Sequence, residues 1–585
     1  MQLAEHFLKL NKELLGESPI RTVHITISGL ANILECSERN VKYIIKEMDA
    51  QGWVEWKPKA GRGHASSLSF IRKAEEVFFK IARQKLDAGD FAWSFSQLKY
   101  LDMDAREQYF QLLPGYFGFH EIEKNNRSLD VARVLYPSPG ITLSPRGPLY
   151  IEQTQIVKQI FDTLVRFNEE TGKIEPHIAH HYEIEPSGQA LHFYIRKGVF
   201  FHNGMELTGS DIKYSFEEMI SQGGRGILPR MFKNIKRIDV QQPYHVSIYL
   251  KEPNFLFIHL LGYPEASIVP EKIHQALGDD FNRHPIGSGP FKVAEHTKKR
   301  LVLDAHAIYF KERPLLDQLQ FYFVPEIIHF NAQLPAHLST INRIESHDFE
   351  RGATFLTFNQ NKSGICQNND FRKALYYGLD KQGLTSKLQS SARPADSFLS
   401  EREHTPKYNP ELASIYLQNS GYSRETIHLF TKQGNTHVKS AEILKEQWSK
   451  LGVDVAIHSV SLEEIGTGDF YNVCDIFLSK ELISGSDADL ELIELQSRFK
   501  WFLNDDLITG LKKVQKQIFR ESSPQKRYRH YLRIEKSLKR DFLVIFLFRN
   551  KQMLQTSLNS LEISLYGYGT PFDKLWNKPA SVSKI

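Results

Sequence analysis

Apolar and polar residues alternate most clearly between Leu191 and Arg196, where every second side chain is apolar. A period of two is typical of a strand with one buried face. Asn203-Gly204 follows and favours a tight turn, because both residues tolerate positive φ. Thr208 then stands three residues before Asp211, as the N-cap of a helix would. The apolar face of that helix consists of Ile212, Phe216, Met219 and Ile220. We predict a strand, a turn and a capped helix over residues 191–220.

Three segments of the first fifty residues carry apolar side chains at helical spacing. Ser28 and Ser37 are the candidate N-caps of the second and third helices, and Gly52 follows the third as a C-terminal glycine would. A short strand is predicted at 23–26, and two more at 53–57 and 66–70 flank the Gly-rich loop 58–64. The inward positions of the helices are Leu3, Phe7, Leu10 and Leu14, then Leu30, Ile33 and Leu34, then Val41, Ile44, Ile45 and Met48.

This order of helices and strands is that of a winged helix-turn-helix module, whose third helix enters the major groove of DNA. Polar side chains of the third helix could reach base edges, and basic side chains of the wing could reach phosphates. The alternative is the solvated polar face that any three-helix domain has, since residues 1–100 hold 15 Lys and Arg against 12 Asp and Glu. The predicted DNA contacts are Ser37, Arg39, Asn40, Lys42, Tyr43 and Lys46 on the helix, and Lys57, Lys59, Arg62 and His64 on the wing.

Helical patterns continue from Ile71 to Leu113 and extend this module. Pro114-Gly115 and the polar run from Lys124 to Ser128 are turn-forming and are the strongest linker signals in this part of the chain. We therefore predict a first domain over 1–115, a linker over 116–128 and a second domain over 129–585.

The segment GVFFHNGMELTGSDIKYSF, which contains the turn described above, resembles the signature of the family 5 extracytoplasmic solute-binding proteins. Gly209 stands where that family usually has Ala. Four further segments resemble the family in the same order along the chain: LDVARVLYPSPGITLSP, QIVKQIFDTLVRFNEETGKIEPHIAHHYEI, HPIGSGPF and FRKALYYGLDK. The resemblance covers about 450 residues and implies a large α/β domain of the type II periplasmic-binding-protein kind, the peptide- and nickel-binding family.

The resemblance implies two lobes that close on a solute by a hinge motion. We expect the first lobe at about 129–350 plus 501–585, and the second at about 351–500. By analogy with the family, the loops at about 144–152 and 480–489 hold the solute. The candidate contacts are Ser144, Arg146, Tyr150, Glu481 and Asp487, each with an ordinary surface residue as the alternative. The second loop lacks the Trp of peptide-binding members, so peptide specificity does not carry over.

A winged helix ahead of a solute-binding domain, with the module ending in GRGHASSLSF, resembles the SgrR family of transcriptional regulators. That resemblance implies a regulator that binds double-stranded DNA and responds to a small solute, a sugar, phosphosugar or oligopeptide-like molecule. A homodimer is a candidate oligomeric state. The alternative from another class is a solute-binding receptor of an ABC transporter in which the N-terminal module is only an adaptor.

Composition and charge agree with a globular protein, since 41% of residues are hydrophobic and the formal charge of +5 is small for 585 residues. Cys36, Cys366 and Cys474 are odd in number and widely separated, which favours a reducing compartment. The first 18 residues lack the apolar core of an export signal. The longest apolar segment, Phe542–Phe548, has the length of a strand, far from the roughly 20 residues of a membrane span. We predict a cytoplasmic protein without membrane contact.

No catalytic constellation is found, so no enzymatic activity and no cofactor are predicted. His177, His180 and His181 form a small cluster, but the sequence has no HExxH motif and no Cys nearby, so a metal site is not predicted. Gly287-Ser288-Gly289-Pro290 is not followed by Gly-Lys-Ser/Thr and is not a phosphate loop. The basic run Lys526–Arg540 has an apolar stripe and is interpreted as a solvated helix face.

Overall fold

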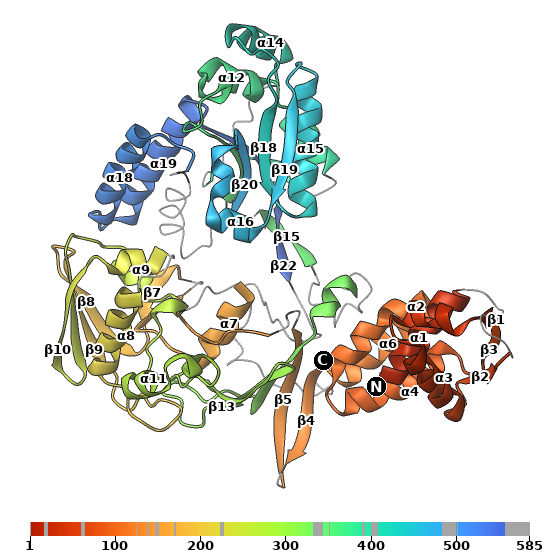
Figure 1. Ribbon diagram of the computed structural model, residues 1–585. Coiled ribbons are helices and arrows are strands. Elements are labelled where there is room, and N and C mark those ends of the chain that lie inside the picture. Colours follow the sequence, from red (N-terminus) through yellow and green to blue (C-terminus); the bar gives the residue numbers. More distant parts are fainter. Residues whose placement is uncertain are drawn as a thin grey trace, which may run out of the picture.

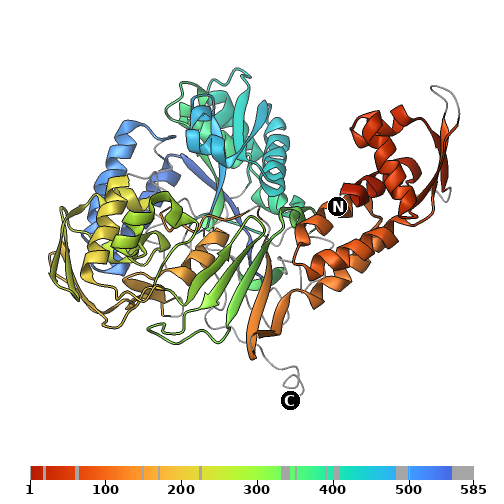
Figure 2. The same ribbon diagram turned by 60° about the horizontal axis from the view of Figure 1, so that its bottom comes forward.

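The chain folds into an N-terminal module followed by two α/β lobes, as the computed structural model shows in Figures 1 and 2. The structure describes residues 2–16, 21–59, 65–124, 126–136, 138, 140–146, 151–168, 171–222, 227–330, 343–349, 352–388, 392–398, 408–482, 499 and 501–555.

The first part of the N-terminal module is the predicted winged helix. Its elements are α1 (Gln2–Leu15), β1 (Thr22–Ile25), α2 (Ile27–Leu34), α3 (Glu38–Ala50), β2 (Val54–Lys57) and β3 (Ser66–Phe70), with the three strands in the antiparallel order β1-β3-β2. The predicted inward residues Phe7, Leu30, Val41 and Ile45 are buried.

One predicted cap in this module is wrong. Helix α2 is capped by Thr26, whose Oγ1 accepts from the backbone N–H of Gly29 at 3.0 Å, and Ser28 lies inside the helix. A cap needs extended backbone at its own position, which Thr26 has at φ −84° and ψ 158°. Ser37 caps α3 as predicted and accepts from the N–H of Asn40.

The helical extension forms α4 (Ala74–Asp87), α5 (Phe91–Gln97) and α6 (Met103–Leu112), and it packs directly on the first lobe. The ring of Phe91 meets that of Tyr322 at 4.5 Å between centroids, and the ring of Phe110 meets that of Phe330 at 6.2 Å. The buried core of the module therefore continues into the lobe without a break.

The predicted linker 116–128 is wrong, because most of it is a strand. Strand β4 (Gly118–Lys124) pairs along its whole length with β5 (Arg127–Tyr136) and forms the edge of the first lobe's sheet. The polar run that suggested a linker contains the hairpin turn, where Asn126 adopts φ 58°. Turn-forming residues mark hairpins and linkers alike, so composition alone does not separate the two.

Lobe I contains a five-stranded sheet of order β12-β13-β14-β5-β4, a four-stranded sheet of order β10-β11-β9-β8 and the hairpin β6–β7. Its remaining strands are β6 (Val165–Asn168), β7 (Lys173–Pro176), β8 (Ala179–Ile184), β9 (Ala190–Ile195), β10 (Ile235–Gln242), β11 (His245–Leu250), β12 (Phe291–His296), β13 (Arg300–Ala305) and β14 (Gln318–Phe323). Its helices are α7 (Ile151–Ile160), α8 (Gly209–Gln222), α9 (Ile227–Phe232), α10 (Phe257–Leu260) and α11 (Glu271–Leu277).

The strand, turn and helix predicted over 191–220 are confirmed as β9, a turn at Gly204 with φ 83°, and α8. In the capping pair the acceptor is the carboxylate of Asp211: the backbone N–H and the hydroxyl of Thr208 both donate to Asp211 Oδ2, at 2.9 and 3.1 Å. The imidazole of His202 ties the turn to the segment that contains Gly287 and Gly289, through hydrogen bonds of 3.3 and 3.0 Å. This stretch is scaffold of lobe I.

Lobe II is built on a six-stranded sheet of order β17-β21-β16-β20-β18-β19. Its strands are β16 (Gly352–Phe358), β17 (Arg393–Pro394), β18 (Ile427–Lys432), β19 (Val455–Val460), β20 (Ile476–Leu482) and β21 (Val544–Arg549). Its helices are α12 (Asn369–Tyr377), α13 (Lys381–Lys387), α14 (Pro410–Asn419), α15 (Asn435–Ser449) and α16 (Leu462–Thr467).

The C-terminal segment 501–585 was predicted to belong to lobe I, and the structure contradicts this for β21, which pairs with β16 inside the lobe II sheet. The preceding hairpin of α18 (Asp505–Phe519) and α19 (Pro524–Arg540) contacts both lobes. Phe519 accepts from Phe255 N in lobe I at 2.8 Å, and Glu535 accepts from Phe398 N in lobe II at 3.0 Å. An apolar run predicts a strand but does not say which sheet the strand joins.

Two antiparallel strands, β15 (Arg343–Phe349) and β22 (Lys551–Gln555), pair with each other between the lobes. Figure 1 shows them running from lobe II toward lobe I. No helix of the described part of the chain is long and apolar enough to cross a bilayer.

Candidate DNA-binding face and solute-binding edge

The face of α3 that was predicted to contact DNA is exposed. All six predicted residues are exposed, and Tyr43 exposes 62% of its surface. Arg39, Lys42, Tyr43 and Lys46 lie at i, i+3, i+4 and i+7, so they share one side of the helix, opposite the buried Val41, Ile44, Ile45 and Met48. Figure 1 places the strands beside this helix at the end of the module that is farthest from the lobes.

The charges on this face are largely available to a partner. Arg39, Lys42 and Lys46 form no salt bridge with any residue that the structure describes. Lys57, at the base of the wing, lies 3.0 Å from Glu55, but both side chains are about half exposed or more, so water screens this pair. Lys59 is exposed, and its backbone N–H donates to Ser66 Oγ at 3.1 Å. Arg62 and His64 lie outside the described residues.

The predicted solute contacts of lobe I divide into buried and undescribed residues. The side chain of Arg146 is buried: its Nε lies 3.1 Å from Glu218 Oε2, and its other nitrogens donate to the backbone carbonyls of Ser215, Glu265 and Ser267. Ser144 is also buried and accepts from the N–H of Arg146 at 3.2 Å. Tyr150 lies outside the described residues. The placement of Arg146 contradicts its predicted contact with a solute, because every nitrogen of its guanidinium already has a partner inside the lobe.

Of the two solute contacts predicted in lobe II, the structure describes only Glu481, at the end of β20. Glu481 lies there, half-buried and paired across the sheet with Ala353, and Ser479 Oγ donates to it at 3.5 Å. Asp487 lies outside the described residues.

The carboxyl ends of three parallel strands meet at one edge of lobe II. Strand β18 runs parallel to both β19 and β20, and β20 ends opposite Gly352, the first residue of β16. Since β16 follows the connecting strand β15, this edge faces the connection to lobe I. Solutes bind in open α/β sheets outside the carboxyl ends of the strands, so this edge is the candidate solute-binding edge.

Basic side chains gather at this edge. Lys432 ends β18, Lys480 lies near the end of β20, and His437 lies in the first turn of α15. Burial, together with the neighbouring charges of Lys432 and Lys480, lowers the pKa of His437 to about 4. The first turn of α15 carries no acid, so the positive end of the helix dipole adds to the lysine charges. This edge can attract an anionic group, with His437 neutral at pH 7.

Sequence reasoning missed these three residues. The signal that could have found them is position: Lys432 ends a strand, His437 lies in the first turn of the next helix, and Lys480 lies near the end of a neighbouring parallel strand, where an α/β sheet presents its ligand-binding edge.

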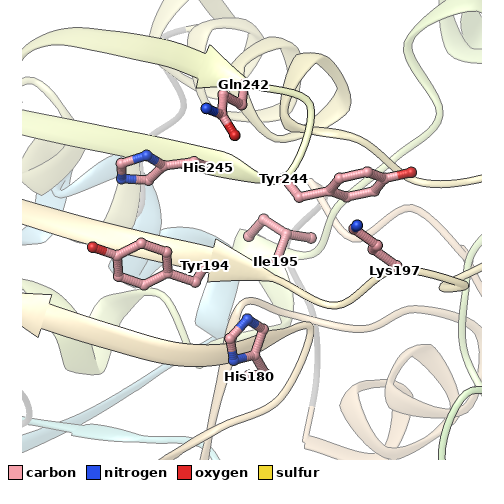
Figure 3. Close-up of a pocket in the computed structure, with 7 residues that line it drawn as sticks. All are labelled: His180, Tyr194, Ile195, Lys197, Gln242, Tyr244 and His245. Atoms are coloured by element: carbon pink, nitrogen blue, oxygen red, sulfur yellow. The ribbon is translucent and has the colours of Figure 1, made fainter.

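Lobe I has a further hollow on the outer face of its four-stranded sheet (Figure 3). His180, Tyr194 and His245 come from three neighbouring strands, and the rings of Tyr194 and His245 stack at 4.7 Å. The rest of the lining is Ile195, Lys197, Gln242 and Tyr244. Figure 1 shows this sheet at the side of lobe I that lies away from the N-terminal module, and the hollow shares no residue with the solute-binding edge.

The three histidines of the predicted cluster do not converge. His177 is buried and lies 2.7 Å from Asp162, which also accepts from Ser288, Tyr309 and Arg166. Burial lowers the pKa of His177 to about 4, whereas His180 and His181 are exposed beside Tyr194. Among the residues that the structure describes, no group of three or more His, Cys, Asp or Glu could hold a metal ion.

Two family models match this chain. The family described as bacterial extracellular solute-binding proteins, family 5 middle, matches residues 173–489, and the one described as sugar transport-related sRNA regulator N-term matches residues 2–118.

Similar curated proteins cover most of the chain. The uncharacterized protein YhjP of Bacillus subtilis (strain 168) is 28% identical over 81% of this chain and 81% of its own. The HTH-type transcriptional regulator SgrR of Photorhabdus laumondii is 28% identical over 82% of this chain and 84% of its own. The regulator of the same name from Yersinia pestis (strain Pestoides F) is 32% identical over 62% of each chain.

Solved structures share the fold of the two lobes. NikA from Brucella suis, in complex with Fe(III)-EDTA, has a TM-score of 0.63 at 18% identity and matches 77% of this chain and all of its own. The oligopeptide-binding protein AppA from Bacillus subtilis, in complex with a nonapeptide, has a TM-score of 0.60 at 20% identity and matches 77% of this chain and 99% of its own.

Proposed function

The chain belongs to the family 5 bacterial extracellular solute-binding proteins, and we propose that it works as a ligand-responsive transcriptional regulator. Ahead of the solute-binding domain it carries the N-terminal domain of the sugar transport-related sRNA regulators. It binds double-stranded DNA through α3 and the wing, and it senses a small solute between its lobes. The observation that carries the proposal is the exposed face of Arg39, Lys42, Tyr43 and Lys46 on a module whose core is shared with a solute-binding lobe.

The solute is proposed to carry an anionic group. Lys432 and Lys480 place positive charge at the lobe II edge that faces the connection to lobe I, and charge-assisted hydrogen bonds to such a group are stronger than neutral ones. A phosphosugar or another acidic small molecule fits this edge. Glu481 beside Lys480 could accept from a hydroxyl or amine of the same solute.

Closure of the lobes is proposed to carry the signal. The N-terminal module packs on lobe I through Phe91, Phe110 and Phe117, so the module and lobe I move as one body. Hinge motion at β15 and β22 then moves lobe II relative to the DNA, while the orientation of α3 on lobe I stays fixed. A solute must bind the closed state more tightly than the open state by a few kcal/mol to make this an effective switch.

The test combines a solute screen with DNA binding. Thermal unfolding is measured with sugars, phosphosugars, other small acids and peptides, because a ligand that binds only the folded state raises the midpoint. Mobility shift of the DNA upstream of the protein's own gene is then measured at low salt, with and without each hit. Absence of DNA binding under all these conditions would refute the regulator.

A transport receptor with an adaptor module is the second candidate, favoured by the match of residues 173–489 to extracellular solute-binding proteins. The two candidates predict different locations. We propose that the regulator acts in the cytoplasm and pairs as a homodimer on two half-sites of DNA. Cell fractionation separates the candidates, since the receptor would be found outside the cytoplasm, and light scattering of the purified protein tests the dimer.

A further inference from the structure

The C-terminal helical hairpin carries a concentration of positive charge that the winged helix does not account for. Residues 505–541 hold 11 Lys and Arg against 5 Asp and Glu, a net charge of +6, while the whole chain has a net charge of only +5. The excess positive charge of the protein is therefore located in these 37 residues, which form α18 and α19.

One face of α19 presents this charge as a regular stripe. Along the helix the basic side chains follow each other at spacings of three or four residues, which places them on one side of an α-helix. All of them are exposed, and at 1.5 Å per residue they cover about 21 Å of the helix. The members of this cationic stripe are Lys526, Arg529, Arg533, Lys536 and Arg540.

The stripe is weakly neutralised by its surroundings. Glu535, the one acid of α19, turns to lobe II, where it accepts from Phe398 N, and burial raises its pKa. Glu521 and Asp541 pair with Lys526 and Arg540 at the two ends. The three central side chains form no salt bridge with any residue in the described part of the chain.

The opposite face of α19 is apolar, and its burial explains how the helix is held on the lobes but does not explain the basic side chains of the stripe. Tyr531 and Leu538 are buried in the core that the helix shares with α18 and both lobes, and Ile534 packs against that core. Because the apolar face anchors the helix, the fold does not require five basic side chains on the other face.

The absence of apolar surface in the stripe favours a nucleic acid over an acidic protein as the partner. Protein interfaces centre on buried aromatic or aliphatic side chains, and Tyr528 is the one large apolar side chain of residues 505–541 that is substantially exposed. Phosphate backbones need only cations at regular spacing, and each contact releases condensed counterions.

We propose that the cationic stripe of α19 is a second contact surface for the phosphate backbone of duplex DNA, which lets one protein molecule hold two DNA segments. Figures 1 and 2 both show α18 and α19 on the opposite side of the lobes from the N-terminal module. The segment held by α19 is therefore a different one from the segment held by α3.

The test uses the full-length protein and two duplexes of unrelated sequence, one fixed on beads and one labelled in solution. The stripe variant carries Arg529→Gln, Arg533→Gln and Lys536→Gln, and Gln keeps high helix propensity. The matched control carries Lys236→Gln, Lys272→Gln and Lys445→Gln, which removes three exposed charges elsewhere on the lobes. Thermal unfolding of both variants should stay within about 2 °C of the parent.

We expect the parent and the control to bring the labelled duplex to the beads, and the stripe variant to show little of this bridging while α3 still binds one duplex. The slope of log affinity for non-specific DNA against log salt should also decrease by about 0.9 for each phosphate that the variant no longer neutralises. Unchanged bridging and an unchanged slope in the stripe variant would overturn the proposal. Loss of all DNA binding in an α3 variant tests the winged-helix contact alone, whatever the stripe variant does.

Discussion

Asp90 of the N-terminal module lies 3.2 Å from the ammonium group of Lys299 in the β12–β13 turn of lobe I, and Lys85 of the module lies equally close to the same carboxylate oxygen. Burial raises the pKa of Asp90, but the hydrogen bonds from Lys85 and Lys299 outweigh it and hold that pKa below its usual value. This charged contact lies beside the aromatic contact of Phe91 and Tyr322, so the module and the lobe are joined by two kinds of interaction.

The charged contact of Asp90 between the N-terminal module and lobe I should weaken in acid. A carboxylate with a lowered pKa in the folded state stabilises that state above its unfolded pKa of about 3.9, and the effect disappears as pH falls through the folded pKa. Asp90→Asn should therefore lower the unfolding free energy by about 1 to 2 kcal/mol at pH 7 and by much less near pH 3. Calorimetric unfolding at the two pH values measures the difference. An equal cost at both would show that the charge of Asp90 is not involved.

The aromatic contact should be needed for signalling and not for solute binding. Tyr322→Ala removes the ring that packs on Phe91 and Phe117 and should loosen the module on lobe I. We expect the solute to raise the unfolding midpoint of lobes I and II as before, while its effect on DNA affinity falls at least several-fold. Tyr322→Phe keeps the ring and should behave like the parent. A Tyr322→Ala variant with a normal DNA response would contradict rigid coupling.

The sequence predicted the fold where local pattern decides it, and it failed where the partner of a segment decides it. The alternation of Leu191–Arg196 and the turn at Gly204 specify β9 and its turn from local residues alone. The apolar run that forms β21 specifies a strand, but its place beside β16 depends on pairing across almost two hundred residues. Arg146 was predicted as a solute contact because the corresponding loop holds the solute in the family that the sequence resembles. The burial of its side chain depends on Glu218 and three carbonyls brought together by the tertiary fold.

Arg146 should prove structural. Its guanidinium and the carboxylate of Glu218 are nearly inaccessible to water, and removing one partner of a buried pair costs about 3 to 5 kcal/mol. Arg146→Ala should lower the unfolding midpoint of the protein by several degrees in the absence of any solute. A folded Arg146→Ala protein with parental stability and no solute response would restore the predicted contact, and Glu218→Gln serves as the matched test of the pair.

The DNA-binding face of α3 should act mainly through charge. Lys42→Gln and Lys46→Gln each remove an exposed cation without changing the buried face of the helix. Each should weaken DNA binding across all sequences and reduce the salt slope by about 1 if the side chain contacts a phosphate. Lys80→Gln on α4 removes an exposed charge elsewhere on the same module and is the control. Equal effects of all three substitutions would point to net charge instead of a defined face.

The turn that contains His202 should make the protein sensitive to acid. Burial lowers the pKa of His202 to about 4, and its ring bonds Gly289 O while it accepts from Gly287 N. A histidine with a lowered pKa is neutral in the folded state but gains a proton on unfolding below about pH 6.5, so stability is lost as pH falls from 6.5 toward 4. His202→Gln should lower stability at pH 7 because it disturbs these hydrogen bonds, yet it should reduce the loss of stability between pH 6.5 and 4 by up to about 3 kcal/mol.

Urea unfolding across this pH range measures the slope of stability against pH. The control is His180→Gln, at an exposed position close in sequence to the buried His177, and it should leave that slope unchanged. A slope for His202→Gln equal to that of the parent would assign the acid sensitivity to other histidines whose pKa burial lowers, such as His177, His306 and His437.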